Sequence, residues 1–128
     1  MFAHVSIGVS DFKKSLKLYD VVMPLIGYDR LFGDEDDDFM AYGPEESFFI
    51  INTPENPQRG DVTFNNGGHI CLKAPTPESV DAFYYKAVDL GVEDAGKPGL
   101  RPHYLENYYA AFIFDYDGNK IEVMARKT

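Results

Sequence analysis

An internal duplication constrains the fold of this chain more than any other feature of its sequence. The stretch HVSIGVSDFKKSLKLYDVVMPLIGYD, which starts at His4, aligns with HICLKAPTPESVDAFYYKAVDLGVED, which starts at His69. In this alignment Tyr19 also meets Tyr84. A repeat of this kind indicates two copies of one supersecondary unit, each of which needs the other to cover its apolar surface.

Each copy is predicted to begin with a strand and a helix. In the first strand Val5, Ile7 and Val9 alternate with small or polar residues, which is typical of a strand with one buried face. Helix-start signals that contain Asp11 and Thr76 precede the two amphipathic stretches. Three short strand patterns follow each helix, within residues 28–34, 38–44 and 47–53 and within residues 92–99, 108–115 and 119–125. Each copy is therefore expected to be a βαβββ module.

The 128 residues fit a single α+β domain made of these two modules. We expect the first module at residues 1–56, a linker at 57–66 and the second module at 67–128. A module of about 60 residues alone would leave the far face of its sheet open. The two sheets are therefore expected to pair, within one chain or across a dimer, and to enclose a cleft.

Three residues are predicted to meet in this cleft. His4 and His69 occupy equivalent positions on the faces opposite the aliphatic residues, and Glu122 lies between two core residues of the last strand. Each has an ordinary alternative: a solvent-facing residue near the terminus, a core histidine and an exposed strand carboxylate. Together they form a ligand set for one divalent ion, such as Zn, Ni, Mn or Fe, with open positions for water or substrate.

A second set of candidates surrounds the stretch Gly99–Phe112. An arginine can bind a carboxylate or phosphate, a histidine can act as acid or base near neutral pH, and tyrosines can bind substrate or move a proton. The alternative is a loop whose aromatic residues pack on a dimer partner. The catalytic candidates are His103 and Tyr109, and the substrate-binding candidates are Arg101, Tyr104, Tyr108 and, on the opposite wall, Tyr42.

Composition narrows the classes of partner. The formal net charge of −9 argues against nucleic acid and against anionic membranes, both of which attract clustered Lys and Arg. The acidic run Gly33–Phe39 is interpreted as a solvated hairpin tip rather than a calcium loop, because it lacks the EF-hand spacing. The one cysteine, Cys71, is expected to be a small buried side chain. No signal peptide or apolar run of bilayer length is recognisable, so a cytoplasmic protein is expected.

Three motifs carry a resemblance to a known family. HVSIGVSDFKKSLKLYD, GGHICLKAP and the closing hairpin FDYDGNKIEVM resemble the vicinal oxygen chelate superfamily, which includes glyoxalase I, extradiol dioxygenases and bleomycin-resistance proteins. The resemblance implies two βαβββ modules that form a U-shaped, incomplete barrel around one divalent metal, often in a homodimer. It also implies His4, His69 and Glu122 as ligands. Ile50 stands where glyoxalase I has a further glutamate ligand, which argues against true glyoxalase I activity.

Three functions are compatible with these patterns. The first is a divalent-metal-dependent enzyme acting on a small oxygen-chelating substrate, with isomerase, lyase, transferase and dioxygenase chemistry left open. The second is a metal-free protein of the bleomycin-resistance type that binds or sequesters a small molecule. The third is a partner-binding domain that has kept the fold and lost the chemistry.

Overall fold

The repeated βαβββ order is confirmed by the computed structural model, which describes residues 1–54 and 56–127. The expected module boundaries include Glu55 and Thr128, which lie outside the described residues. The elements are β1 (His4–Gly8), α1 (Phe12–Leu25), β2 (Arg30–Asp34), β3 (Phe39–Tyr42), β4 (Phe48–Asn52), a short 3₁₀ helix η1 (Pro57–Arg59), β5 (Ile70–Lys73), α2 (Pro77–Asp89), β6 (Glu93–Leu100), β7 (Tyr108–Phe114) and β8 (Lys120–Arg126).

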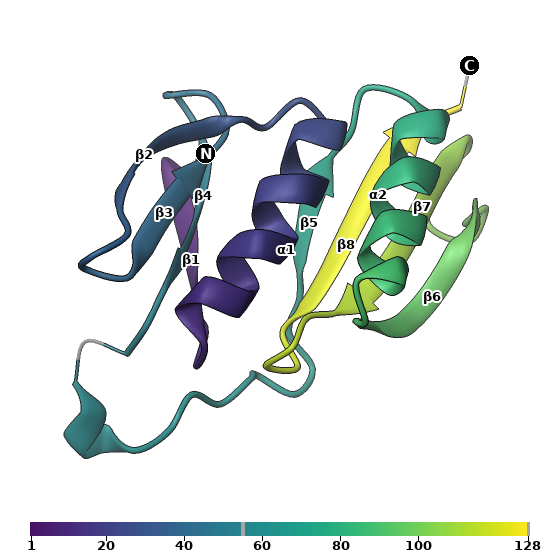
Figure 1. The fold of residues 1–128 in the computed structure, drawn as a ribbon. Coiled ribbons are helices and arrows are strands. Elements are labelled where there is room, and N and C mark those ends of the chain that lie inside the picture. Colours follow the sequence, from purple (N-terminus) through teal and green to yellow (C-terminus); the bar gives the residue numbers. More distant parts are fainter. Residues whose placement is uncertain (55, 128) are drawn as a thin grey trace.

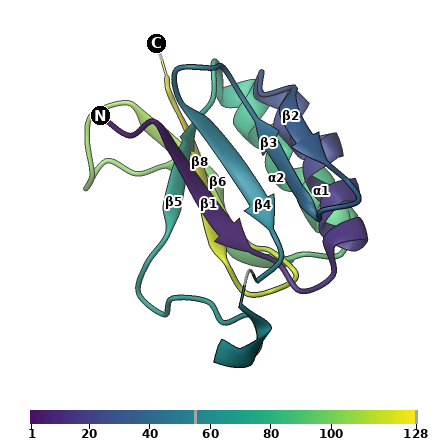
Figure 2. The ribbon, with the colours of Figure 1, turned by 90° about the vertical axis from the view of Figure 1, so that its left-hand side faces the viewer.

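Each module forms its own four-stranded sheet. The strand orders are β1-β4-β3-β2 and β5-β8-β7-β6, so the first strand of each module lies at an edge of its sheet. The first strand pairs in parallel with the last, and the remaining pairs are antiparallel. Figures 1 and 2 show α1 and α2 side by side on one face of the two sheets. The opposite face carries His4, Tyr108 and Glu122, three of the residues predicted to form the site.

Both helices begin at the start signals predicted from the sequence. The Asp11 side chain accepts a hydrogen bond from the backbone N–H of Lys14 (3.1 Å) in α1. Thr76 and Ser79 form a reciprocal capping box in α2. Gly27 follows α1 with a φ of 88°, a left-handed conformation that favours glycine. Among the described residues, neither helix has the length and apolar character needed to cross a bilayer.

The aliphatic face of each first strand packs beneath the helices, as predicted. Ile7 and Val9 of the first module are buried, and so are Leu72 and Ala74 at the equivalent positions of the second. Val5 and Ile70 are partly buried against the same core. Burying these side chains is the main favourable contribution to folding, and it leaves the alternate residues of β1 and β5 on the other face.

The turn between β7 and β8 ties the second module to the first. Asp115 is only 5% exposed, and its carboxylate accepts hydrogen bonds from the Tyr19 hydroxyl of α1 (2.8 Å) and from the backbone N–H of Asn119 (2.9 Å). The Asn119 side chain donates to the carbonyl of Gly8 at the end of β1 (3.0 Å). The turn therefore joins α1 and β1 to the second sheet.

The acidic run forms a hairpin tip, as predicted. Residues 35–38 make the exposed turn between β2 and β3. The backbone N–H of Asp36 donates to the Asp34 carboxylate (2.9 Å). Asp38 has a φ of 56°, a conformation that aspartate tolerates in tight turns. Glu35 lies 3.5 Å from the Arg30 guanidinium, and the carboxylates of Asp36 and Asp37 are exposed to solvent.

Candidate functional site

A buried carboxylate lies on the helix-free face of the second sheet. Glu122 is 3% exposed, although its neighbours in β8 fill the hydrophobic core on the other side. Its Oε1 lies 2.9 Å from Nε2 of His69, and its Oε2 accepts a hydrogen bond from the Tyr108 hydroxyl (2.5 Å). Burial and this hydrogen bond raise the pKa of Tyr108, so the phenol keeps its proton and donates a hydrogen bond to Glu122. Both carboxylate oxygens are thereby fixed.

Cys71 lies beside this group rather than in the core. It pairs with Glu122 in the sheet register, and its Sγ lies 3.7 Å from the Tyr108 hydroxyl. The side chain is exposed, which corrects the expectation of a buried cysteine, because the register places position 71 on the face without helices. Desolvation and the Glu122 carboxylate raise the pKa of the Cys71 thiol to about 12. The thiol is therefore protonated near neutral pH and is a poor nucleophile.

A cavity of about 440 Å³ lies between the first strands of the two modules. It is lined by residues of β1, β4 and β5, and both His4 and His69 contribute to its wall. The His4 ring stacks on Phe48, with centroids 5.0 Å apart. In the described part of the chain, no three His, Cys, Asp or Glu side chains lie close enough together to hold a metal ion. The structure thus pairs His69 with Glu122, while His4 lies on the same cavity wall outside that pair.

The His69 and Glu122 pair fits two adjacent positions of a metal centre. Imidazole nitrogen and carboxylate oxygen bind divalent transition metals at about 2.1 Å, so two ligand atoms at a right angle lie about 3 Å apart. The observed separation between His69 Nε2 and Glu122 Oε1 is 2.9 Å. A small movement of either side chain would replace the direct contact between them with contacts to a shared metal ion. This pair could therefore hold an ion with two ligands, and a third ligand would have to come from another residue.

The strand register also shows which residue of the second module corresponds to Ile50. It pairs with Ser6 in the first sheet, as Glu122 pairs with Cys71 in the second. Because position 6 is equivalent to position 71 in the duplication, Ile50 and Glu122 are equivalent residues. The first module therefore carries an aliphatic side chain where the second carries its carboxylate.

The candidate residues of the stretch Gly99–Phe112 occupy different positions around this site. Tyr108 contacts Glu122 directly, as described above. Tyr104 packs edge-on against Tyr108, with ring centroids 5.4 Å apart, and is half exposed. The His103 ring packs against Tyr104 at a tilted angle, with ring centroids 4.3 Å apart, in an exposed turn. Arg101 lies over the ring of Phe112, with 5.7 Å from its guanidinium carbon to the ring centroid. Tyr108 and Arg101 thus lie nearest to the site, and His103 lies at the outer rim.

Tyr109 lies on the opposite face of β7, which corrects its prediction as a catalytic residue of the cleft. Its hydroxyl donates to the Asp81 carboxylate of α2 (2.6 Å). That hydrogen bond raises the pKa of Tyr109 to about 12. Successive residues of a strand point to opposite faces, so Tyr108 and Tyr109 cannot both face Glu122.

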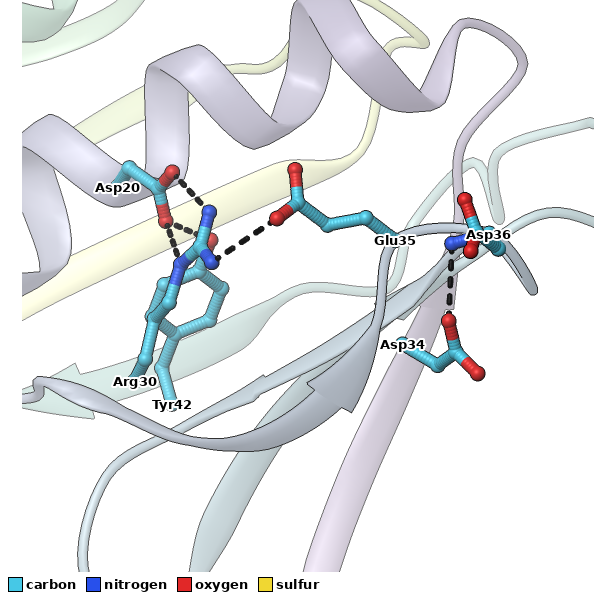
Figure 3. A network of polar contacts seen from close by, with 6 residues as sticks. All are labelled: Asp20, Arg30, Asp34, Glu35, Asp36 and Tyr42. Carbon is cyan, nitrogen blue, oxygen red and sulfur yellow. Dashed lines mark hydrogen bonds and ion pairs between the residues drawn. The ribbon is translucent and has the colours of Figure 1, made fainter.

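The prediction that Tyr42 lies on the wall of the cleft is also wrong. It is fully buried on the helix side of β3, where its hydroxyl donates to Asp20 of α1 (2.8 Å). The same carboxylate forms two hydrogen bonds with the Arg30 guanidinium, at 2.8 and 2.6 Å (Figure 3). This network joins α1 to the first sheet. Tyr42 therefore has a structural position and does not reach the cavity.

Two residues near the site were not predicted from the sequence. Phe112 lies opposite Glu122 in the register of β7 and β8, and the His69 ring packs edge-on against it at 5.8 Å. The Lys120 ammonium lies 5.0 Å from the centroid of the same ring. The alternation of β8 could have identified Lys120 from the sequence, because position 120 lies on the same face of the strand as position 122.

Comparisons with known proteins agree with this architecture. A structure described as a glyoxalase/bleomycin resistance protein from Albidiferax ferrireducens T118 is 30% identical, with a TM-score of 0.85 over 99% of each chain. Lactoylglutathione lyase from Agrobacterium tumefaciens shares the fold at 18% identity, with a TM-score of 0.65 over 98% of this chain and 92% of that one. The fosfomycin resistance protein FosX from Listeria monocytogenes shares it at 16% identity, with a TM-score of 0.66 over 99% and 93%.

No curated protein matches the sequence significantly. The family model described as Glyoxalase/Bleomycin resistance protein/Dioxygenase superfamily matches residues 1–123, which is nearly the whole chain. The two open sheets, each with its helix, have the arrangement of that fold. The chain therefore belongs to the glyoxalase/bleomycin resistance protein/dioxygenase superfamily.

Proposed function

We propose that this protein is a divalent-metal-dependent enzyme that acts on a small oxygen-chelating substrate in the cleft between its two modules. The observation that carries the proposal is the buried Glu122 carboxylate, 2.9 Å from His69 Nε2 and hydrogen-bonded to Tyr108. Burying a carboxylate without a cation or several donors costs several kcal/mol. Glu122 is held by His69 and Tyr108, and a buried carboxylate paired with a histidine that lines a cavity is a candidate for function.

In this proposal His69 and Glu122 bind the ion, and Tyr108 orients the carboxylate. A bound divalent metal would supply Lewis-acid polarisation of a substrate oxygen. Tyr108 holds Oε2 of Glu122 through its hydrogen bond, which leaves Oε1 directed at His69. Partners of this kind fix the geometry of metal ligands and contribute to metal affinity. His103 is the proposed acid–base residue of the rim.

His4 is the proposed third ligand. It shares the cavity wall with His69 and occupies the equivalent position in the duplication. Its ring must leave Phe48 to bind an ion together with His69, or else the His4 of a second copy in a homodimer takes that place. Either route supplies a third ligand and leaves coordination positions for a substrate that binds through two oxygens.

A metal-free binding protein is the second candidate, and a different observation favours it. The helix-free face of the first module is aromatic: Phe32 packs edge-on against both Phe39 and Phe48, and Phe48 stacks on His4. Such a wall suits a flat apolar ligand. In this alternative His4 contributes its ring to the wall rather than a ligand atom to an ion.

Metal titration of the full chain, after removal of metal with a chelator, separates the two candidates. Calorimetry with Mn²⁺, Ni²⁺ and Zn²⁺ is expected to show one site per chain. His69→Ala and Glu122→Gln are expected to weaken it at least about 100-fold, because outer partners of metal ligands alone contribute about 10–100-fold. The matched control is His103→Ala, which removes an exposed histidine outside the pair and should leave metal affinity unchanged.

The outcomes are distinct. Equal affinity in the wild type and in Glu122→Gln would overturn the metal proposal. A tenfold or larger loss in His4→Ala would support His4 as the third ligand, and unchanged affinity would remove it from the set. If no ion binds to the wild type while a flat aromatic probe such as anilinonaphthalene sulfonate does, the metal-free alternative is favoured.

A further inference from the structure

Two cationic side chains and one imidazole approach a single aromatic ring next to the site. The guanidinium carbon of Arg101 lies 5.7 Å from the centroid of Phe112, and the Lys120 ammonium lies 5.0 Å from it. The His69 ring approaches the same ring edge-on at 5.8 Å. Phe112 is directly opposite Glu122 in the sheet. The positive charges therefore gather around the residue that adjoins the His69 and Glu122 pair.

The Arg101 guanidinium is held in a defined position. It donates to the backbone carbonyls of Lys97 (2.7 Å) and Gly99 (3.0 Å). A Cβ atom at Gly99 would lie 3.2 Å from Nη1 of Arg101, and one at Gly96 would lie 3.4 Å from Nη2 and 3.0 Å from the Phe112 ring. The two glycines thus leave the space that the guanidinium fills. A side chain held in this way loses little further entropy when it binds a ligand.

Neither Arg101 nor Lys120 forms an ion pair with a carboxylate of the described residues. The chain has 21 acidic residues against 12 Lys and Arg. Across residues 1–54 and 56–127, the ion pairs involve Arg30 with two carboxylates and His69 with Glu122, and neither Arg101 nor Lys120 takes part. In so acidic a protein, two neighbouring cations without carboxylate partners are available to an external anion.

One cavity lies between Lys120 and the proposed metal ligand His69. Lys120 and His69 line one cavity of about 250 Å³. His69 also lines the larger cavity between the modules. Arg101 has five N–H donors and uses two hydrogen bonds to hold its position, so further donors remain for oxygen atoms.

We propose that Arg101 and Lys120 form an anion-binding subsite and that the substrate is a small molecule carrying a carboxylate, phosphate or phosphonate group. The anionic group binds between the two cations beside Phe112, and its neighbouring oxygens reach His69 and Glu122. This assignment of the substrate class rests on the proposed function, whereas the subsite itself depends only on Arg101 and Lys120.

Anion titration of the metal-free full chain tests the subsite apart from the metal. Malonate and inorganic phosphate, each added at constant ionic strength, are the probes for the carboxylate and phosphate arms. Binding is followed by ¹H–¹⁵N chemical-shift changes at Gly96, Gly99 and the Nε–H of Arg101. Arg101→Gln and Lys120→Gln are each expected to weaken binding of the preferred anion at least about tenfold, as for loss of a charge-assisted hydrogen bond.

Lys17→Gln is the matched control, because it removes the same charge from the exposed surface of α1. It should leave anion binding unchanged. Gly99→Ala keeps both charges but crowds the guanidinium, and it is expected to weaken binding several-fold. A loss in Gly99→Ala therefore supports a positioned site if Arg101→Gln fails to fold.

The result that would overturn the subsite is no binding of either anion at millimolar concentration, or equal weakening by Lys17→Gln and Arg101→Gln. Equal weakening would indicate general attraction to positive charge. Metal titration of the same variants keeps the two proposals separate. If Arg101→Gln loses anion binding and keeps its metal affinity, both proposals are supported. If the wild type binds anions but binds no metal, only the metal proposal fails.

Discussion

The two modules share one backbone plan and carry different chemistry on the faces without helices. In the second module that face holds His69, Glu122 and Tyr108, joined by hydrogen bonds. In the first it holds Phe48 and its aromatic neighbours, with His4 stacked on them. The core residues beneath the helices are apolar in both. The duplication thus conserved the face that stabilises the fold, and the other face diverged into a polar half and an apolar half.

Two pairs of equivalent positions show how the helix-free faces of the two modules differ. Ile50 takes the place of Glu122, and Ser6 takes the place of Cys71. A carboxylate needs donors when it is buried, and the second module supplies His69 and Tyr108 for that purpose. An isoleucine needs none, so the first module was free to become an apolar wall. The proposed chemistry is therefore assigned to the second module, and the first shapes the cleft.

The turn between β7 and β8, which joins the second module to the first, gives the prediction with the largest expected effect. Asp115→Ala removes a buried acceptor and leaves the fully buried Tyr19 hydroxyl without its partner. The free energy of unfolding should fall by about 3 kcal/mol, since each buried unsatisfied group costs about 1–3 kcal/mol. Urea denaturation measures it. Tyr19→Phe, which removes only one donor, should cost about 1 kcal/mol, and a fall below that in Asp115→Ala would contradict the role of this turn.

Adjacent tyrosines of β7 provide a sharper comparison of the two faces. Tyr108→Phe removes the donor to Glu122, and Tyr109→Phe removes the donor to Asp81 on α2. Each should lower the free energy of unfolding by about 1 kcal/mol. Only Tyr108→Phe should weaken metal binding, by about tenfold, because it orients a proposed ligand. Calorimetry on both variants checks this. Similar losses of metal affinity in both would show that the effect is a general loosening of β7.

The acidic tip of the first module gives the smallest expected effect. Asp36→Ala and Asp37→Ala remove exposed charges, so the free energy of unfolding should change by less than about 0.5 kcal/mol. Millimolar Ca²⁺ should leave the Tm of the wild type unchanged. A Ca²⁺-dependent rise in Tm that disappears in these variants would mean that the tip binds an ion and that the first module has polar chemistry of its own.

The fold was largely predictable because the duplication and the strand alternation agree. In β5 and β8 one face is aliphatic and the other carries His69, Lys73 or Glu122, so the period of two assigned the faces correctly. In β3 and β7 both faces are apolar or aromatic, and alternation alone does not say which one meets the helix. Tyr42 and Tyr109 were misassigned for this reason.

The details of the site depend on packing between segments that are distant in the sequence. The stacking of His4 on Phe48 follows from the parallel register of β1 and β4, which hydrophobic periodicity does not encode. The gathering of Arg101 and Lys120 around Phe112 needs the irregular register of β6, where two glycines make room. The sequence therefore identified candidate residues by their type, but it did not identify the residues that they contact.

The most direct measurement of the central claim is anomalous diffraction from a crystal of the protein loaded with Mn²⁺ or Zn²⁺, recorded at the absorption edge of the metal. The division between the modules predicts one strong peak in the cleft, about 2.1 Å from both Nε2 of His69 and the carboxylate of Glu122. A peak near the acidic tip of the first module and none beside Glu122 would contradict this account. The absence of any peak in a crystal grown with a saturating concentration of the metal would contradict it as well.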